Sequence, residues 1–127
     1  MEVAHLPAGL GRIFSSRELL DAFHDFTSSL YCEENLLFLE EVMDMKRQRR
    51  TSAIGSIFSK YIREDSPLQV NIDAQLQADI AGKFRNSKAF PVLELSVFDS
   101  AFTHVAELIE RDSVVKFREV DGYVVVC

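Results

Sequence analysis

Tyr31-Cys32-Glu33-Glu34-Asn35-Leu36-Leu37-Phe38-Leu39-Glu40-Glu41-Val42 is the stretch that decides the fold of this chain. Its two leading glutamates, Glu33 and Glu34, suit the first turn of a helix, because acidic side chains complement the positive end of the helix dipole. The apolar residues after them cover a broad surface, as expected for a helix in the middle of a bundle. The stretch therefore predicts a helix that starts near residue 33 and has neighbours on several sides.

Upstream of this stretch, the sequence predicts an arm followed by a helix. Residues 1–13 are expected to form an irregular N-terminal arm, and residues 14–127 the domain proper. The arm is expected to hold one helical turn and to be pinned by Leu6, Leu10, Ile13 and Phe14. Ser15 and Glu18 have the spacing of a capping box. Apolar residues then recur at helical spacing and predict a helix over residues 16–30; they are Leu19, Phe23, Phe26 and Leu30.

Downstream, three more helices are expected. An apolar stripe from Ile54 to Ile62 predicts one of them, and Pro67 ends it because proline disfavours helical geometry in the preceding residue. Asp73 is a good N-cap for the next helix. Ser96 and Asp99 have the spacing of a cap and predict the start of another helix. The apolar residues of this helix no longer keep their helical spacing after Arg111-Asp112-Ser113, so we expect a bend or joint there. Gly122 is expected to end the last helix.

Length and composition favour one all-α domain. The chain has 127 residues and a net charge of −6, so nucleic acid is disfavoured as the general partner, since phosphate binding needs a basic face. Its two cysteines, Cys32 and Cys127, have no ligand-like spacing and favour a reducing, cytoplasmic compartment. We see no signal peptide and no apolar run long enough to span a membrane.

Several segments, in order and at compatible spacing, resemble the signature of the regulator of G-protein signalling (RGS) domain family. They are Tyr31-Cys32-Glu33-Glu34-Asn35 with Phe38, Val70-Asn71-Ile72-Asp73, Val97-Phe98-Asp99-Ser100-Ala101, and Leu108-Ile109-Glu110-Arg111-Asp112-Ser113 with Phe117 and Tyr123. The similarity covers residues 14–125. Leu39 departs from an aromatic position of the family, Cys32 from a small polar one, and Lys116 from a position that often holds arginine, whose planar fork lysine lacks.

The resemblance implies a nine-helix, two-lobed all-α domain that contains an antiparallel four-helix bundle. It also implies that three joints between helices bind the switch regions of a G-protein α subunit (Gα) in its GTP-bound or transition state, and so accelerate GTP hydrolysis. The chain would then be a GTPase activator without catalytic residues, cofactor or metal of its own. Carried over by position, the partner-binding residues are Cys32, Glu34, Asn35, Asn71, Leu108, Asp112, Ser113 and Lys116.

Each of these residues also has a simpler interpretation. Asn35 and Asn71 could satisfy local backbone groups, Asp112 could pair with Arg111 or Lys116 on the surface for little energy, and Leu108 could belong to the core. Taken together in family order, they favour the interface. A second hypothesis is an RGS-homology scaffold that docks another protein without stimulating hydrolysis.

Two further interpretations concern other groups of residues. The basic run Lys46, Arg47, Arg49 and Arg50 is expected to be a solvated helix end that complements the helix dipole, with contact to an anionic membrane as the alternative. That contact would place a monomeric chain at the inner face of the plasma membrane. An enzyme is disfavoured, because a di-iron bundle needs two Glu-x-x-His pairs and the nearest approach is Asp21-x-x-His24.

Overall fold

The computed structural model describes residues 6–30, 32–86 and 94–120, and the description below concerns these residues. They form seven α-helices, joined or extended by four short 3₁₀ or π-helical segments, where the resemblance implies nine helices. The α-helices are α1 (Ala8–Phe14), α2 (Arg17–Ser29), α3 (Glu33–Gln48), α4 (Ile54–Ile57), α5 (Ala74–Asn86), α6 (Asp99–Ile109) and α7 (Val115–Val120). The described residues contain no strand, and the predicted all-α class is confirmed.

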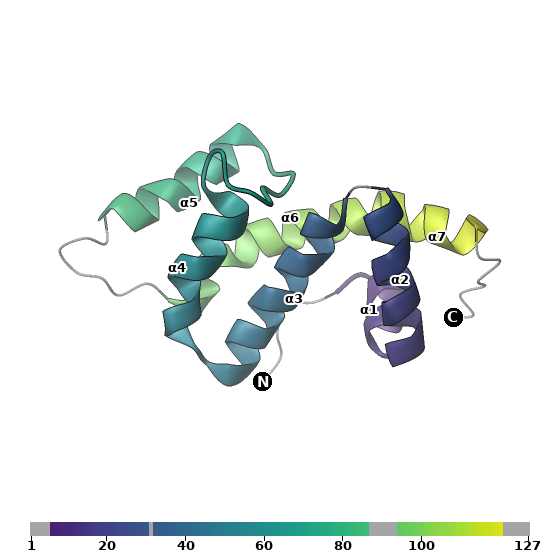
Figure 1. Ribbon diagram of the computed structural model, residues 1–127. Helices are drawn as coiled ribbons and strands as arrows, with labels where there is room; N and C mark the ends of the chain where they lie inside the picture. Colours follow the sequence, from purple (N-terminus) through teal and green to yellow (C-terminus); the bar gives the residue numbers. More distant parts are fainter. Residues whose placement is uncertain (1–5, 31, 87–93, 121–127) are drawn as a thin grey trace.

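The helices form two lobes (Figure 1). In one lobe, α3 packs against α4 and α6, and the π-helical continuation of α4 (Phe58–Ile62) packs against α5, which makes an antiparallel four-helix bundle. In the other lobe, α1 packs against α2 and against the helical segment that follows α6. None of the helices among the described residues is both long and apolar enough to cross a membrane.

Each lobe has its own cluster of aromatic side chains. In the bundle, the ring of Phe38 makes edge contacts with Tyr61 and Phe98, at centroid separations of 5.6 and 6.2 Å. In the terminal lobe, Phe23 and Phe117 meet edge to face at 5.2 Å. All of these rings are buried, and such pairs add about 1 kcal/mol each beyond the burial of their area.

One continuous helical run, residues 95–120, crosses both lobes. It consists of a 3₁₀ turn (Leu95–Phe98), α6, a π-helical segment (Glu110–Val114, called the π segment below) and α7. The apolar stripe steps by five residues from Ile109 to Val114 where an α-helix would need three or four. The wider π turn absorbs that step, so Val114 stays buried. The expected bend or joint at Arg111-Asp112-Ser113 is this π segment.

Two predicted caps are wrong. Ser16, not Ser15, caps α2: its extended backbone lets its Oγ accept from the Leu19 N–H at 3.2 Å. Ser15 instead ends α1 in a helical conformation and donates to the Arg12 carbonyl at 2.7 Å. Ser96 does not cap with Asp99 either, because Ser96 lies within the 3₁₀ turn.

Other predicted helix ends agree with the structure. Asp73 caps α5, since its Oδ1 accepts from the Leu76 N–H at 2.7 Å. The N-terminal arm is pinned by Leu10 and Ile13 as expected, since both side chains are fully buried, and its helix α1 has seven residues where one turn was expected. The boundary at residue 14 stays a prediction, and Gly122 and Tyr123 lie outside the described residues.

Candidate functional site

Three joints between helices surround one open hollow on the surface. The joints are the α2–α3 corner, the segment before α5, and the end of α6 with the π segment. The hollow is lined by Cys32, Glu34, Asn35, Gln69, Val70, Asn71, Leu108, Ile109, Asp112 and Ser113. The structure thus brings together all the partner-binding residues predicted from the sequence except Lys116.

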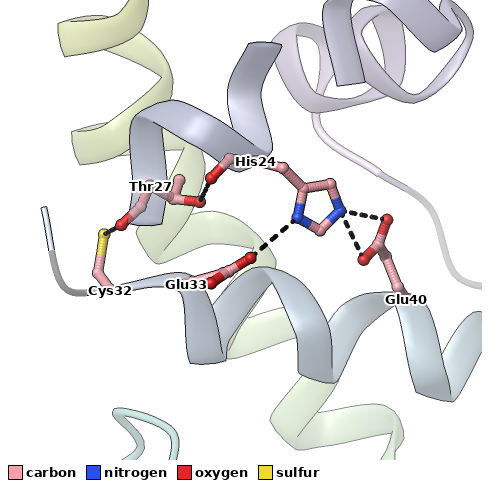
Figure 2. Close-up of polar contacts among 5 residues, drawn as sticks. All are labelled: His24, Thr27, Cys32, Glu33 and Glu40. Atoms are coloured by element: carbon pink, nitrogen blue, oxygen red, sulfur yellow. Dashed lines mark hydrogen bonds and ion pairs between the residues drawn. The ribbon is translucent and has the colours of Figure 1, made fainter. Parts of the chain in front are cut away.

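At the first joint, Cys32 is the residue before α3 and turns the chain back toward α2. Its backbone N–H donates to the Thr27 carbonyl oxygen at 3.1 Å, and its Sγ lies 3.6 Å from the same oxygen. Figure 2 shows this contact beside His24. These bonds fix where α3 begins, and therefore where Glu34 and Asn35 lie.

His24 holds the same corner from inside α2. Its Nε2 lies 2.9 Å from the carboxylate of Glu40, and its Nδ1 lies 3.4 Å from that of Glu33 (Figure 2). Burial lowers the pKa of His24, but the hydrogen bonds and charges of Glu40 and Glu33 outweigh it and raise the pKa above the ordinary 6.5. His24 is therefore a half-buried bridge between α2 and α3.

Asn35 joins the first joint to the second. Its side chain is buried, and its Oδ1 accepts a hydrogen bond from the Asn71 backbone N–H at 3.3 Å. Asn35 therefore satisfies a backbone group 36 residues away, and not a local one as the simpler interpretation holds. The bond also sets the position of Asn71, whose own side chain is exposed at the rim of the hollow.

The third joint contributes residues of different character. Leu108 is half-buried near the end of α6 and gives apolar surface to the hollow, together with Val70 and Ile109. Ser113 is buried, with its Oγ 3.9 Å from the Cys32 Sγ, so the first and third joints touch. Asp112 is exposed on the π segment.

The charges around the hollow are mainly negative. Burial raises the pKa of the Cys32 thiol, and the carboxylates of Glu34 and Asp112 raise it further, against a hydrogen bond from Ser113. The thiol therefore stays protonated at neutral pH. With two carboxylates and three side-chain amides around an apolar floor, the hollow suits a partner that presents backbone N–H groups or cationic side chains.

Lys116 lies beyond the hollow and forms a surface ion pair. Its Nζ is 3.2 Å from Asp112 Oδ1, and both side chains are more than half exposed. This is the pairing that the simpler interpretation of Asp112 offers, and such a pair contributes little stability.

The basic run is divided by the fold. Lys46 is buried and its Nζ lies 2.6 Å from Asp99 Oδ1, so it does not belong to an exposed basic surface. The expectation is wrong for this residue, because Lys46 lies on the face of α3 that packs against α6. Arg47, Arg49 and Arg50 are exposed at the end of the helix, and Arg47 and Arg50 lie within 3.7 Å of Asp44.

Sequence reasoning missed three residues of the hollow, Gln69, Val70 and Ile109, as contact residues. Each lies one or two positions from a predicted contact residue, so nearness along the chain is the signal that could have found them. Tyr31 lies outside the described residues. In the part of the chain that the structure describes, no three histidine, cysteine or acidic side chains are placed to hold a metal ion.

Comparisons with known proteins agree with the geometry of the fold. The family model described as "Regulator of G protein signaling domain" matches residues 9–125. "Regulator of G-protein signaling 18" of Mus musculus is 33% identical over 116 residues, which cover 88% of this chain and 47% of that protein. "Regulator of G-protein signaling 16" of Bos taurus is 30% identical over 115 residues, covering 87% of this chain and 54% of that protein. The chain thus spans about half the length of these relatives.

Proposed function

This chain belongs to the regulator of G protein signaling domain family, and we propose that it binds the switch regions of a Gα subunit and accelerates GTP hydrolysis by that subunit. The observation that carries the proposal is the hollow at the three joints. It gathers Glu34, Asn35, Asn71 and Asp112 from segments far apart in the sequence around an apolar floor.

The proposed mechanism is differential binding. An activator accelerates a reaction when it binds the transition state more tightly than the ground state, and a hundredfold acceleration requires only about 2.7 kcal/mol. A few hydrogen bonds formed only with switch regions in their transition-state arrangement supply that amount. The chain itself forms or breaks no covalent bond.

Each side chain has a proposed role that follows from its place at the hollow. Asn71 is exposed at the rim and reaches toward the catalytic glutamine of Gα, which it orders. Glu34, Asn35 and Asp112 hold the backbone and neighbouring side chains of the switch regions. Leu108 supplies apolar contact. No arginine needs to come from this chain, because Gα carries its catalytic arginine in cis.

The place of action in the cell follows from the partner. Gα subunits act at the inner face of the plasma membrane, so we propose that the chain works there as a cytoplasmic monomer. The exposed arginines Arg47, Arg49 and Arg50 offer an anionic membrane a basic contact. Lys46 takes no part in it.

A scaffold without hydrolysis-stimulating activity is the second candidate. It is favoured by two departures from the family pattern: Cys32 at the first joint, and Lys116, which pairs with Asp112 outside the hollow. A scaffold would dock its partner without preference for the transition state, because docking alone does not need complementarity to the reacting form.

Single-turnover hydrolysis tests the proposed function. Gα is loaded with GTP, and phosphate release is followed with and without saturating chain. We expect the rate constant to rise about a hundredfold, equivalent to about 2.7 kcal/mol. An unchanged rate constant across several Gα classes, with the chain folded, would contradict the proposal and favour the scaffold.

A further inference from the structure

Glu110 connects the N-terminal arm to the candidate site. Its Oε2 accepts from the Gly9 N–H at 3.0 Å, and its Oε1 accepts from the Leu10 N–H at 2.9 Å. These two N–H groups lie in the first turn of α1, where an α-helix has no partners of its own for its N–H groups. Pro7, the residue before the helix, has only a hydrocarbon side chain. A side chain about 100 positions away therefore caps α1.

The contact leaves no free space for a side chain at position 9. A Cβ atom there would lie 2.7 Å from Glu110 Oε2 and 2.9 Å from Val114 Cγ1. Both distances are shorter than van der Waals contact, so the side chains of Glu110 and Val114, or the segments that carry them, would have to shift. The backbone of α1 thus rests directly on the first and last residues of the π segment.

The π segment is also the third joint of the hollow. It begins at Glu110, whose carboxylate faces α1, and contains Asp112 and Ser113, which line the hollow. A π turn is less favourable than an α turn and persists where the surroundings hold it. The bonds from Glu110 to α1, together with the burial of Val114, supply such a hold.

We propose that Glu110 is a positioning residue: by binding the first turn of α1 it fixes the π segment that presents Asp112 and Ser113, which makes the N-terminal arm part of the partner-binding apparatus. The inference rests on the proposed function and deepens it. Without the Glu110 bonds, the π segment exchanges among arrangements, and only a fraction of the molecules is ready to bind. The apparent affinity falls by that fraction, while the bound complex keeps its geometry.

Glu110→Gln tests this proposal with little change of shape. It replaces one acceptor oxygen with an NH₂ group that faces the N–H donors of α1. We expect the concentration of chain that gives half-maximal acceleration of GTP hydrolysis to rise about tenfold, with the plateau rate unchanged. A residue that contacts the reacting atoms would lower the plateau instead.

A control and a second variant accompany it. Glu107→Gln removes the same charge from an exposed position three residues earlier, and we expect it to behave as the wild type. Gly9→Ala disturbs the contact from the other side and should also raise the half-maximal concentration. Because both changes break one contact, the double variant should be no worse than the worse single variant.

Amide hydrogen exchange of the chain without Gα gives an independent result. In Glu110→Gln, exchange at Gly9, Leu10 and Glu110–Val114 should rise about tenfold, with residues 51–62 unchanged. If the wild type fails to accelerate hydrolysis, the proposed function fails, and exchange still decides whether Glu110 holds the π segment. The proposal is overturned if Glu110→Gln matches Glu107→Gln in half-maximal concentration, or if exchange at Glu110–Val114 does not change.

Discussion

Two asparagines at the hollow perform different tasks. Asn35 is buried, and its amide oxygen holds the backbone N–H of Asn71. The Asn71 side chain is exposed at the rim and is available to a partner. Substitution of Asn35 should therefore affect stability and function together, whereas substitution of Asn71 should affect function alone.

Asn71→Ala should lower the rate of GTP hydrolysis by Gα in the presence of the chain, while leaving the melting temperature of the chain nearly unchanged. Its backbone N–H and the bond to Asn35 remain, so the fold loses nothing, but the side chain that we propose orders the catalytic glutamine of Gα is gone. We expect a loss of about tenfold or more in the plateau rate of single-turnover hydrolysis. An unaltered rate would remove Asn71 from the mechanism.

Asn35→Ala should lower both stability and activity. The Asn71 N–H loses its acceptor, and the loss of one part-buried hydrogen bond costs about 1 kcal/mol in the free energy of unfolding. Chemical denaturation measures that loss, with Asn71→Ala as the control at the other end of the same bond. Equal stability of the two variants would mean that the Asn35 bond does not hold the joint.

Among the helices, α2 and α3 meet at a corner that carries several ionisable groups. His24 of α2 lies between Glu33 and Glu40 of α3, and a surface hollow beside it is also lined by Arg17 and Asp21 of α2. The raised pKa of His24 means that its protonated form is the one bound to the two carboxylates. The strength of this corner should therefore depend on pH.

The contribution of His24 to stability should decrease as the pH rises. A histidine whose pKa is higher in the folded state stabilises the fold fully below its unfolded value of 6.5, and this stabilisation is lost as the pH rises through the folded value. The difference in unfolding free energy between the wild type and His24→Gln should thus be largest near pH 6 and shrink toward pH 8–9. A difference that is independent of pH would contradict the raised pKa.

The helices were largely predictable from the sequence, whereas the contacts between distant segments were not. Periodicity and local caps such as Asp73 placed α2 to α6, because an amphipathic stripe is a local property. Glu110 and Gly9 meet only because the termini of the domain pack together. Lys46 looked like a solvated helix end because only the packing of α6 against α3 brings Asp99 to it.

The resemblance supplied what residue patterns could not. The three joints have the polar residues that are usual at helix ends, and nothing in their local sequences indicates that they surround one hollow. The family order predicted most of the residues that meet there, and Gln69, Val70 and Ile109 were missed because the resemblance implies no contact role for their positions. Whether these residues bind Gα stays a prediction.

In the molecule as a whole, the bundle is tied together away from the hollow by a partly buried ion pair. The Nζ of Lys46 on α3 lies 2.6 Å from Asp99 on α6, and their side chains are 10% and 48% exposed. Removing one partner of such a pair leaves the other charge with an uncompensated desolvation cost. The pair should therefore affect the stability of the bundle without affecting partner binding.

Asp99→Ala should lower the free energy of unfolding by about 1–3 kcal/mol, because the Lys46 ammonium is left without its carboxylate and the half-exposed position moderates the loss. The double variant Lys46→Met and Asp99→Ala should recover most of it, since the buried charge is then gone. Chemical denaturation of both variants measures the change in stability. GTP hydrolysis by Gα at a saturating concentration of each variant checks that partner binding is unaffected. If Asp99→Ala leaves the free energy of unfolding unchanged, water solvates the Lys46 ammonium in place of the carboxylate, and the pair does not stabilise the bundle.

The central claim is that the hollow at the three joints is complementary to a Gα subunit in the act of hydrolysis. The most direct test is the affinity of the chain for Gα in three states: with GDP, with a GTP analogue, and with GDP and aluminium fluoride, which mimics the transition state. We predict that the aluminium fluoride state binds about a hundredfold more tightly than the GDP state, because the hollow favours the reacting arrangement. Equal affinity for the three states, or binding to none of them, would contradict the claim.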